Sequence, residues 1–336
     1  MAEAPTAAAT AITDSPPLVP RPDRPAPSPQ PAARVRPQEY FTASEWAALS
    51  ARSRWVGLAL VAHCWAVIGL AMTVGTRWPI TLPIVVMVIG ARQLGLFILM
   101  HDAAHAALHR NRGVNDWVAT WLCSSSLRAY RPYHLQHHRY VQQTEDPDLA
   151  LSAPFPITRA SLARKVVRDL TGRTFFKQRF GHVAHGVRGR APGRSALAAF
   201  ATEIAKDRRF LIGNALGFAV FAAFDLAWAW LAMWLLPMMT WLPLVSRIRN
   251  IAEHALVAQN EADPRRQART TRANWLERVL VAPYWVNYHA EHHMFTSIPS
   301  WRLPEAHRLL EHQHTVAAME TERGYLALLN RASAAG

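Results

Sequence analysis

Four apolar runs constrain this chain more than any other feature of its sequence. Two long runs, 55–75 and 80–100, are separated by a short turn, and two more, 210–224 and 226–245, are separated by Asp225. About 20 helical residues cross the hydrocarbon core of a bilayer, and the last two runs together are too long for one crossing. We therefore expect an all-α membrane protein with four transmembrane helices arranged as two hairpins.

The charges beside these runs predict their orientation. The formal net charge is +14, and arginines precede the first run, fill the segment between the two hairpins and follow the last run, whereas the two hairpin turns hold only Arg77 and Asp225. The positive-inside rule then places both termini and every basic segment in the cytosol. Since the positive charge follows this pattern, it gives no support to nucleic-acid binding. Arg92 and Gln93, inside the second run, are expected to face the protein interior.

The remaining segments divide the chain. Residues 1–38 are rich in Ala and Pro and predict a disordered tail, 39–320 form the membrane domain, and 321–336 form a C-terminal tail. Residues 39–53 predict an amphipathic helix capped by Thr42 or Ser44, with Trp46 and Leu49 in the bilayer interface. Residues 114–127 are apolar but too short to span, which favours an interfacial or re-entrant helix, and the basic segment 159–209 is expected to be a loop.

Three histidine clusters carry the chemistry. They comprise His101 and His105, then His134, His137 and His138, and finally His289, His292 and His293. Spacings of three and four residues place the members of each cluster on one helix face. All three clusters fall on the predicted cytosolic side, near the ends of the spans. We therefore interpret them as parts of one metal site.

The composition of these clusters narrows the choice of metal. Eight imidazoles exceed what one tetrahedral zinc ion can use, and would suit two ions with five or six ligands each. Imidazole binds iron, copper, nickel and zinc, so ligand type alone does not decide. The only cysteines, Cys64 and Cys123, are expected to be buried small apolar residues away from the clusters. The clusters also lack the Glu-x-x-His pattern of carboxylate-bridged di-iron bundles. An all-imidazole iron pair is the remaining good fit.

Over residues 45–315 the sequence resembles the membrane fatty-acid desaturase family. The resemblance rests on HDAAH from His101, on HLQHH from His134 with a following DPDL, and on NYHAEHHMF with IPSWRLPEAH near the C-terminus. Within the family the chain is most similar to bacterial acyl-lipid and rhizobitoxine-type desaturases. The resemblance implies a cytosolic helical cap holding a di-iron site that activates O2 and removes two hydrogens from an alkyl chain. It also implies a ninth iron ligand, His254, which Asn250 contacts through water.

Further polar residues near the clusters are expected to support the ligands or to lie outside the site. Asp102, Asp146 and Glu291 are candidates to orient ligand imidazoles through their free ring N–H groups. Asp148 is a further candidate, and for both Asp146 and Asp148 capping of the following turn is an equally good account. Other histidines are expected to be non-ligands: His63 within the bundle, His109 beside the site or on the surface, and His182, His185, His307, His312 and His314 on the surface.

The resemblance and the composition together predict partners and location. The substrate is expected to be a fatty-acyl lipid, an acyl-CoA or an acyl-carrier thioester, since a long chain buries favourably in an apolar tunnel. No haem or flavin motif is visible, so electrons must come from a separate donor such as ferredoxin, rubredoxin or cytochrome b5. The basic face would suit an acidic ferredoxin. We expect a multi-pass protein of a bacterial inner membrane.

Other functions remain open from the sequence. Hydroxylation, ketolation and alkene-forming decarboxylation use similar histidine clusters. A more distant alternative is an intramembrane zinc protease, because HDAAH resembles HExxH with Asp in place of the general base. That alternative leaves six histidines unexplained. A metal transporter would need ligands at mid-membrane, whereas these lie at one face.

Overall fold

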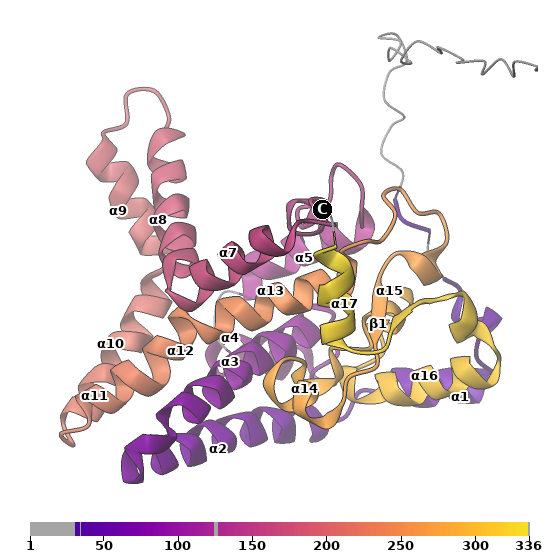
Figure 1. The fold of residues 1–336 in the computed structure, drawn as a ribbon, viewed down its shortest axis with the longest axis horizontal. Coiled ribbons are helices and arrows are strands. Elements are labelled where there is room, and N and C mark those ends of the chain that lie inside the picture. Colours follow the sequence, from indigo (N-terminus) through magenta and orange to yellow (C-terminus); the bar gives the residue numbers. More distant parts are fainter. Residues whose placement is uncertain (1–30, 34, 124–126, 335–336) are drawn as a thin grey trace, which may run out of the picture.

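The computed structural model describes residues 31–33, 35–123 and 127–334, and these are predominantly helical (Figure 1). The predicted disordered tail, 1–38, lies mostly outside the described residues; near its end Pro37–Glu39 forms a 3-10 helix. Helix α1 (Ala43–Ser50) follows, and Thr42 caps it as expected: its hydroxyl accepts from the amide of Glu45 at 3.3 Å, and the Glu45 carboxylate accepts from the amide of Thr42 at 2.8 Å.

The first two apolar runs form a pair of packed helices. Helix α2 (Val56–Arg77) is joined through a 3-10 turn (Pro79–Thr81) to α3 (Leu82–Ala104), and the two lie side by side in Figure 1. Arg92 and Gln93 are buried on α3, as predicted. Arg92 donates to the carbonyl of Val279 at 2.7 Å, and Gln93 donates to the carbonyl of Trp234 at 2.9 Å. Each of these two polar side chains therefore has a hydrogen-bond partner within the protein.

The last apolar stretch contains a turn at Asp225, which has φ +58°. Helix α10 (Arg208–Ala222) precedes the turn; α11 (Ala227–Trp230), a π-helical segment (Leu231–Leu235), α12 (Leu236–Met239) and α13 (Trp241–His254) follow it. Three helical stretches among the described residues are long and apolar enough to cross a membrane: Val56–Arg77, Pro79–Ala104 and Ala227–His254. With 15 residues, α10 is shorter than a usual span. The four-span arrangement thus stays a prediction.

The segment between the first two apolar runs and the last two is mostly helical. It contains α4 (Arg112–Trp121), α5 (Leu127–Arg139), α6 (Leu149–Ser152), α7 (Arg159–Leu170), α8 (Arg173–Arg188) and α9 (Ala196–Lys206). The expectation of a loop over 159–209 was therefore wrong: Thr158 and Ser195 cap α7 and α9, and α8 packs against α9 (Figure 1). His182 and His185 are exposed as expected, but they lie on α8.

The C-terminal part covers the ends of the spans. It contains short 3-10 turns and the elements β1 (Arg269–Thr271), α14 (Trp275–Leu280), α15 (His289–Met294), α16 (Leu303–His312), β2 (Glu320–Glu322) and α17 (Tyr325–Ala332). Strands β1 and β2 pair in parallel, with Thr270 opposite Thr321. The sequence predicts a C-terminal tail over 321–336. Helix α17 lies within that segment and packs against α13, and its Tyr325 and Leu328 are buried.

Helix α1 packs against this C-terminal part. Leu49 is fully buried in an apolar cluster that includes Phe295 and Leu310, and the ring of Trp46 lies 6.0 Å from that of Phe295. The prediction that Leu49 lies in the bilayer interface was therefore wrong, whereas Trp46 is half-buried beside Phe295. The apolar face of α1 packs against α16 and the end of α15 instead of lipid. Cys64 and Cys123 are buried, as predicted.

Candidate metal centre

The ends of four helices meet at one place and bring the histidine clusters together. His101 lies in the last turn of α3 and His105 just after it; α5, α13 and α15 supply the others. Arg131 holds α5 on the end of α3, since its guanidinium donates to the carbonyls of Ala103 and Ala104 at 3.0 Å each and pairs with Asp116 at 2.6 Å. Arg131 thereby adds hydrogen bonds to two carbonyls at the C-terminal end of α3.

All nine predicted ligands converge, and they fall into two groups. The five-histidine group contains His101, His105, His134, His138 and His292; the four-histidine group contains His137, His254, His289 and His293. Within each group, one nitrogen of every ring lies within 4.8 Å of the others. Nitrogens bound to one ion at about 2.1 Å are up to about 4.2 Å apart, so a spread of at most 4.8 Å is compatible with one metal ion in each group after a small adjustment.

The nitrogen contacts within these groups test whether metal fits. Nε2 of His105 lies 2.8 Å from Nε2 of His134, and Nε2 of His254 lies 3.0 Å from Nε2 of His289. Both ring nitrogens of His101 are buried without a hydrogen-bond partner. Buried polar atoms normally have a partner, and a neutral imidazole has only one N–H. Lone pairs that converge in this way suit a cation at the centre of each group.

The protonation states agree with ligand chemistry. Burial lowers the pKa of His105 to about 3, with a smaller effect from the nearby His137 and Arg131. Burial likewise holds the pKa values of His134, His138 and His292 well below the usual range of histidine. These imidazoles are therefore neutral near pH 7, which is the form that binds metal.

The predicted supporting acids behave differently from one another. Nδ1 of His137 lies 2.8 Å from the buried Asp146, and because a carboxylate only accepts, Nδ1 carries the hydrogen and Nε2 is left free to bind metal. Asp102 lies 3.8 Å from Nδ1 of His101 and accepts from the amide of Ser300 at 3.1 Å. Glu291 turns away from both groups.

The carboxylate of Glu291 instead accepts from the hydroxyl of Thr270 and from Nδ1 of His307. It thereby fastens α15 between β1 and α16. His307, predicted at the surface, is consequently buried, and that prediction was wrong. His109 is also buried, where its ring accepts from the amide of Asn111 at 2.9 Å, so of its two expected locations the surface was wrong.

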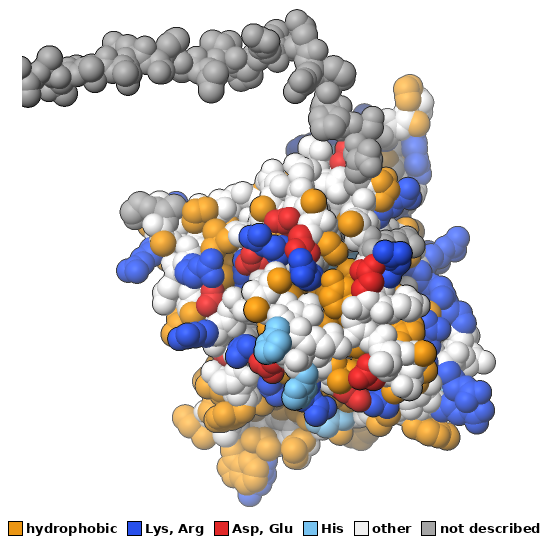
Figure 2. Space-filling view, turned by 90° about the vertical axis from the view of Figure 1, so that its right-hand side faces the viewer, with side chains coloured by type: hydrophobic (Ala, Val, Ile, Leu, Met, Phe, Trp, Pro, Cys, Tyr) orange, Lys and Arg blue, Asp and Glu red, His pale blue; other side chains and the backbone are white. Residues whose placement is uncertain are grey.

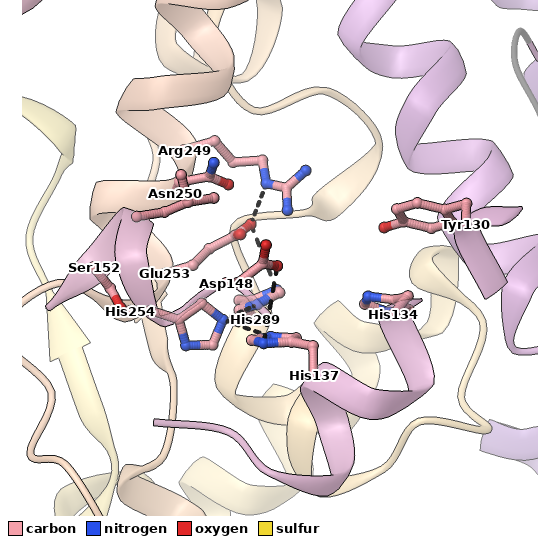
Figure 3. A pocket seen from close by; sticks show the side chains of 11 residues that line it. Tyr130, His134, His137, Asp148, Ser152, Arg249, Asn250, Glu253, His254 and His289 are labelled. Atoms are coloured by element: carbon pink, nitrogen blue, oxygen red, sulfur yellow. Dashed lines mark hydrogen bonds and ion pairs between the residues drawn. The ribbon is translucent and has the colours of Figure 1, made fainter. Parts of the chain in front are cut away.

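Sequence reasoning missed one acid in the site. Glu253 is buried on the last turn of α13, 3.5 Å from Nδ1 of His289, and it pairs with the guanidinium of Arg249 at 2.7 Å. Figure 3 shows both side chains above the histidines. A charged pair four residues apart at the end of an apolar span was the signal that could have found it, because unpaired charges there are costly.

A small cavity lies beside the four-histidine group. Its volume is about 20 Å³, and Asn250, Tyr130, Glu253 and His254 are among the residues that line it. The same residues surround the opening in Figure 3. A cavity of this size with polar walls holds about one water molecule. Asn250 therefore lies where water can connect it to the histidines, although the cavity is far too small for an acyl chain.

The geometry disfavours a zinc protease. In that alternative Asp102 would serve as a general base, whereas here it is buried and bound to the amide of Ser300. Two ions in adjacent histidine sites can instead act on one small molecule together.

His63, predicted to bond within the bundle, contacts the hydroxyl of Tyr284 at 3.1 Å, while His312 and His314 are exposed as expected.

Comparison with known proteins agrees with this geometry. A family model described as fatty acid desaturase matches residues 76–319. Dihydrorhizobitoxine desaturase of Bradyrhizobium elkanii is 26% identical over 251 residues, which are 68% of this chain and 67% of that protein. The chloroplastic omega-6 fatty acid desaturase of Glycine max is 23% identical over 269 residues, 73% of this chain and 59% of that protein.

A protein named for a different reaction is also similar. Beta-carotene ketolase of a Paracoccus species is 25% identical over 275 residues, 77% of this chain and 86% of that protein. The family match covers well over half of the present sequence and includes all three histidine clusters. The chain therefore belongs to the fatty acid desaturase family.

Proposed function

We propose that this member of the fatty acid desaturase family is an O2-dependent di-iron oxidase that introduces a double bond into a fatty-acyl chain. The observation that supports it best is the division of nine converging histidines into a group of five and a group of four. Each group would hold one iron ion. Iron bound there would supply the activation of O2 that removal of hydrogen from an unactivated alkyl chain requires.

The chain's own residues prepare the site for this chemistry. Asp146 fixes the ring of His137 so that Nε2 of His137 faces the four-histidine group. Glu253 lies beside Nδ1 of His289, on the side of the His289 ring opposite its Nε2. Asn250 would position a water molecule in the adjoining cavity. Burial of most of these histidines excludes bulk water, which protects a strong oxidant from side reactions.

The balance of the reaction defines the partners. Removing two hydrogens from two neighbouring carbons while reducing O2 to two water molecules consumes two further electrons and two protons. We propose a separate electron donor, such as ferredoxin, rubredoxin or cytochrome b5, and an acyl group carried on lipid, CoA or carrier protein. We further propose that the protein resides in a bacterial inner membrane with its metal centre and termini in the cytosol.

Expression in a host with defined lipids, followed by mass spectrometry of acyl chains, tests the reaction. The product should be lighter than its substrate by two hydrogens, and metal analysis should find two irons in each chain. His137→Ala should abolish the product while the protein still inserts; His312→Ala, an exposed histidine outside both groups, is the matched control. Zinc in place of iron, or full activity of His137→Ala, would contradict the proposal.

One comparison favours a second reaction at the same centre. Because the chain is similar to a beta-carotene ketolase, insertion of oxygen is the alternative outcome. The same mass spectra separate the two reactions: a hydroxylated chain is heavier by one oxygen, and a ketone is heavier by one oxygen and lighter by two hydrogens. A product of either kind would replace desaturation with oxygenation and leave the metal site unchanged.

A further inference from the structure

A second cavity lies outside the metal centre, between the segment that leads into α2 and the start of α16. Its volume is about 400 Å³, and its walls include Arg52, Val56, Trp301, Arg302 and Arg308. Cavities of about this size bind small molecules. We call it the arginine groove. None of its lining residues is among the predicted metal ligands.

The groove carries unbalanced positive charge. Glu305, also in its wall, pairs with Arg302 at 2.8 Å, which neutralises one of the three arginines. Arg52 and Arg308 are exposed and have no ion-pair partner within the part of the chain that the structure describes. Two free guanidinium groups that come from different segments and line one cavity are suited to a phosphate group, whose oxygens accept paired hydrogen bonds from arginine.

The groove also lies at the membrane boundary. Val56, in its wall, is the first residue of α2, a helix long and apolar enough to cross a membrane. The neighbouring Trp55 is 75% exposed, as expected of an aromatic residue in the headgroup region. Figure 2 shows the side of the molecule on which α1 and α16 lie: charged side chains spread over its middle, and hydrophobic ones gather along its lower edge. A molecule with an anionic head and an apolar chain matches both surroundings.

Two backbone connections join the groove to the metal centre. The amide of Ser300, next to Trp301, donates to Asp102, the neighbour of His101. The amide of Arg110 donates to the carbonyl of Ser53 at 3.3 Å, so the turn that follows the first histidine cluster holds the start of α2. One wall of the groove thus follows Ser300, which is bonded to Asp102, and the other is held by the turn that follows the first histidine cluster.

We propose that the arginine groove binds the phosphate group of an acyl-bearing amphiphile, with Arg52 and Arg308 as its ligands and the acyl chain leaving beside α2. This inference deepens the proposed function and rests on it, because the bound molecule would be the substrate of the metal centre. The phosphate belongs either to a phospholipid headgroup or to the CoA part of an acyl-CoA. Each source has its own probe.

Binding to the full-length, iron-loaded protein tests this without turnover. The probes are dioleoyl phosphatidylglycerol and palmitoyl-CoA, with dioleoylglycerol as the phosphate-free control. The double substitution Arg52→Gln with Arg308→Gln should weaken a phosphate-bearing probe by about tenfold for each arginine and leave dioleoylglycerol unchanged. Replacing both residues by Lys should retain part of the affinity. Arg323→Gln, at an exposed arginine outside the groove, should have no effect.

The outcomes separate the ligand sources and the two proposals. Weakening confined to phosphatidylglycerol assigns the groove to phospholipid, and weakening confined to palmitoyl-CoA assigns it to the thioester. The groove is not a phosphate site if neither probe binds the unmodified protein, if the double substitution leaves both affinities unchanged, or if dioleoylglycerol weakens equally. Iron content and acyl products are measured in parallel. Absence of product with normal phosphate binding would reject the proposed reaction and leave the groove standing.

Discussion

Replacing Asp146 by Asn should affect only the four-histidine group of the candidate metal centre. One carboxylate oxygen accepts from Nδ1 of His137 and from the amide of Asp148, both at 2.8 Å, and the other accepts from the amide of Gln142 at 2.9 Å. An Asn side chain has only one accepting oxygen, so either orientation sets its NH2 group against a buried N–H donor. A buried donor left unpaired in this way costs about 1–3 kcal/mol.

The consequence should appear in iron affinity at the four-histidine group. Loss of a carboxylate that orients a metal-bound histidine lowers metal affinity by about 10–100-fold, or about 1.4–2.8 kcal/mol, which agrees with the cost of the unpaired donor. The five-histidine group contains no direct partner of Asp146 and should keep its iron. Titration with a chelator, followed by metal analysis, should therefore remove iron in two steps from Asp146→Asn.

Asp148→Asn is the matched control. Asp148 lies 3.9 Å from Nδ1 of His137, and its side chain is 28% exposed, so solvent weakens its effect on the ring. The Asp148→Asn variant should lose its iron at nearly the same chelator concentration as the unmodified protein. If Asp146→Asn also released its iron in one step at that concentration, the orienting role of Asp146 would be refuted.

Three further predictions follow from the same geometry. His254→Ala should lower the iron bound by the four-histidine group, measured per chain by metal analysis, whereas the exposed His312→Ala should retain it all; equal contents would remove His254 from the ligand set. The pKa values of the buried histidines are lowered in the folded protein, so below about pH 6.5 the unfolded chain binds more protons than the folded one. The melting temperature of the metal-free protein should therefore fall from pH 7 to pH 5. A constant melting temperature would contradict this. Gly57→Ala should destabilise the fold, since the added carbon would lie 1.9 Å from the carbonyl oxygen of Leu108. Gly69→Ala is the control, because its added carbon meets no atom within 4 Å. Equal melting temperatures of the two variants would show that α2 can shift.

The histidine clusters were predictable because their spacing is local. A helix places residues three and four apart on one face, so HLQHH and HAEHH define their geometry wherever they lie. His254 stands alone in the sequence and was found only through the family resemblance. Its position beside His137 and His289 depends on how α13 crosses α5 and α15, which no local pattern encodes.

Several errors came from the same dependence on tertiary packing, unlike the loop expected over 159–209, which the local caps Thr158 and Ser195 contradict. His307 has the polar neighbours of a surface residue, yet α16 turns it toward Glu291. Leu49 and Trp46 have the pattern of an interfacial helix, and the pattern does not say whether lipid or protein covers the apolar face. Glu253 was missed because the sequence around it does not show which residue it contacts. That residue, His289, comes near it only when α15 packs against the end of α13.

The division of the second and third clusters between the two groups has a consequence for how the centre can change. His137 and His138 are consecutive on α5 but belong to different groups, as do His292 and His293 on α15. Neighbouring positions on a helix differ in direction by about 100°, so each helix would set the distance between the ions that the two groups would hold. A one-residue insertion within either helix would rotate ligands out of both groups at once. Variation that preserves a paired centre is therefore confined to the loops between these helices.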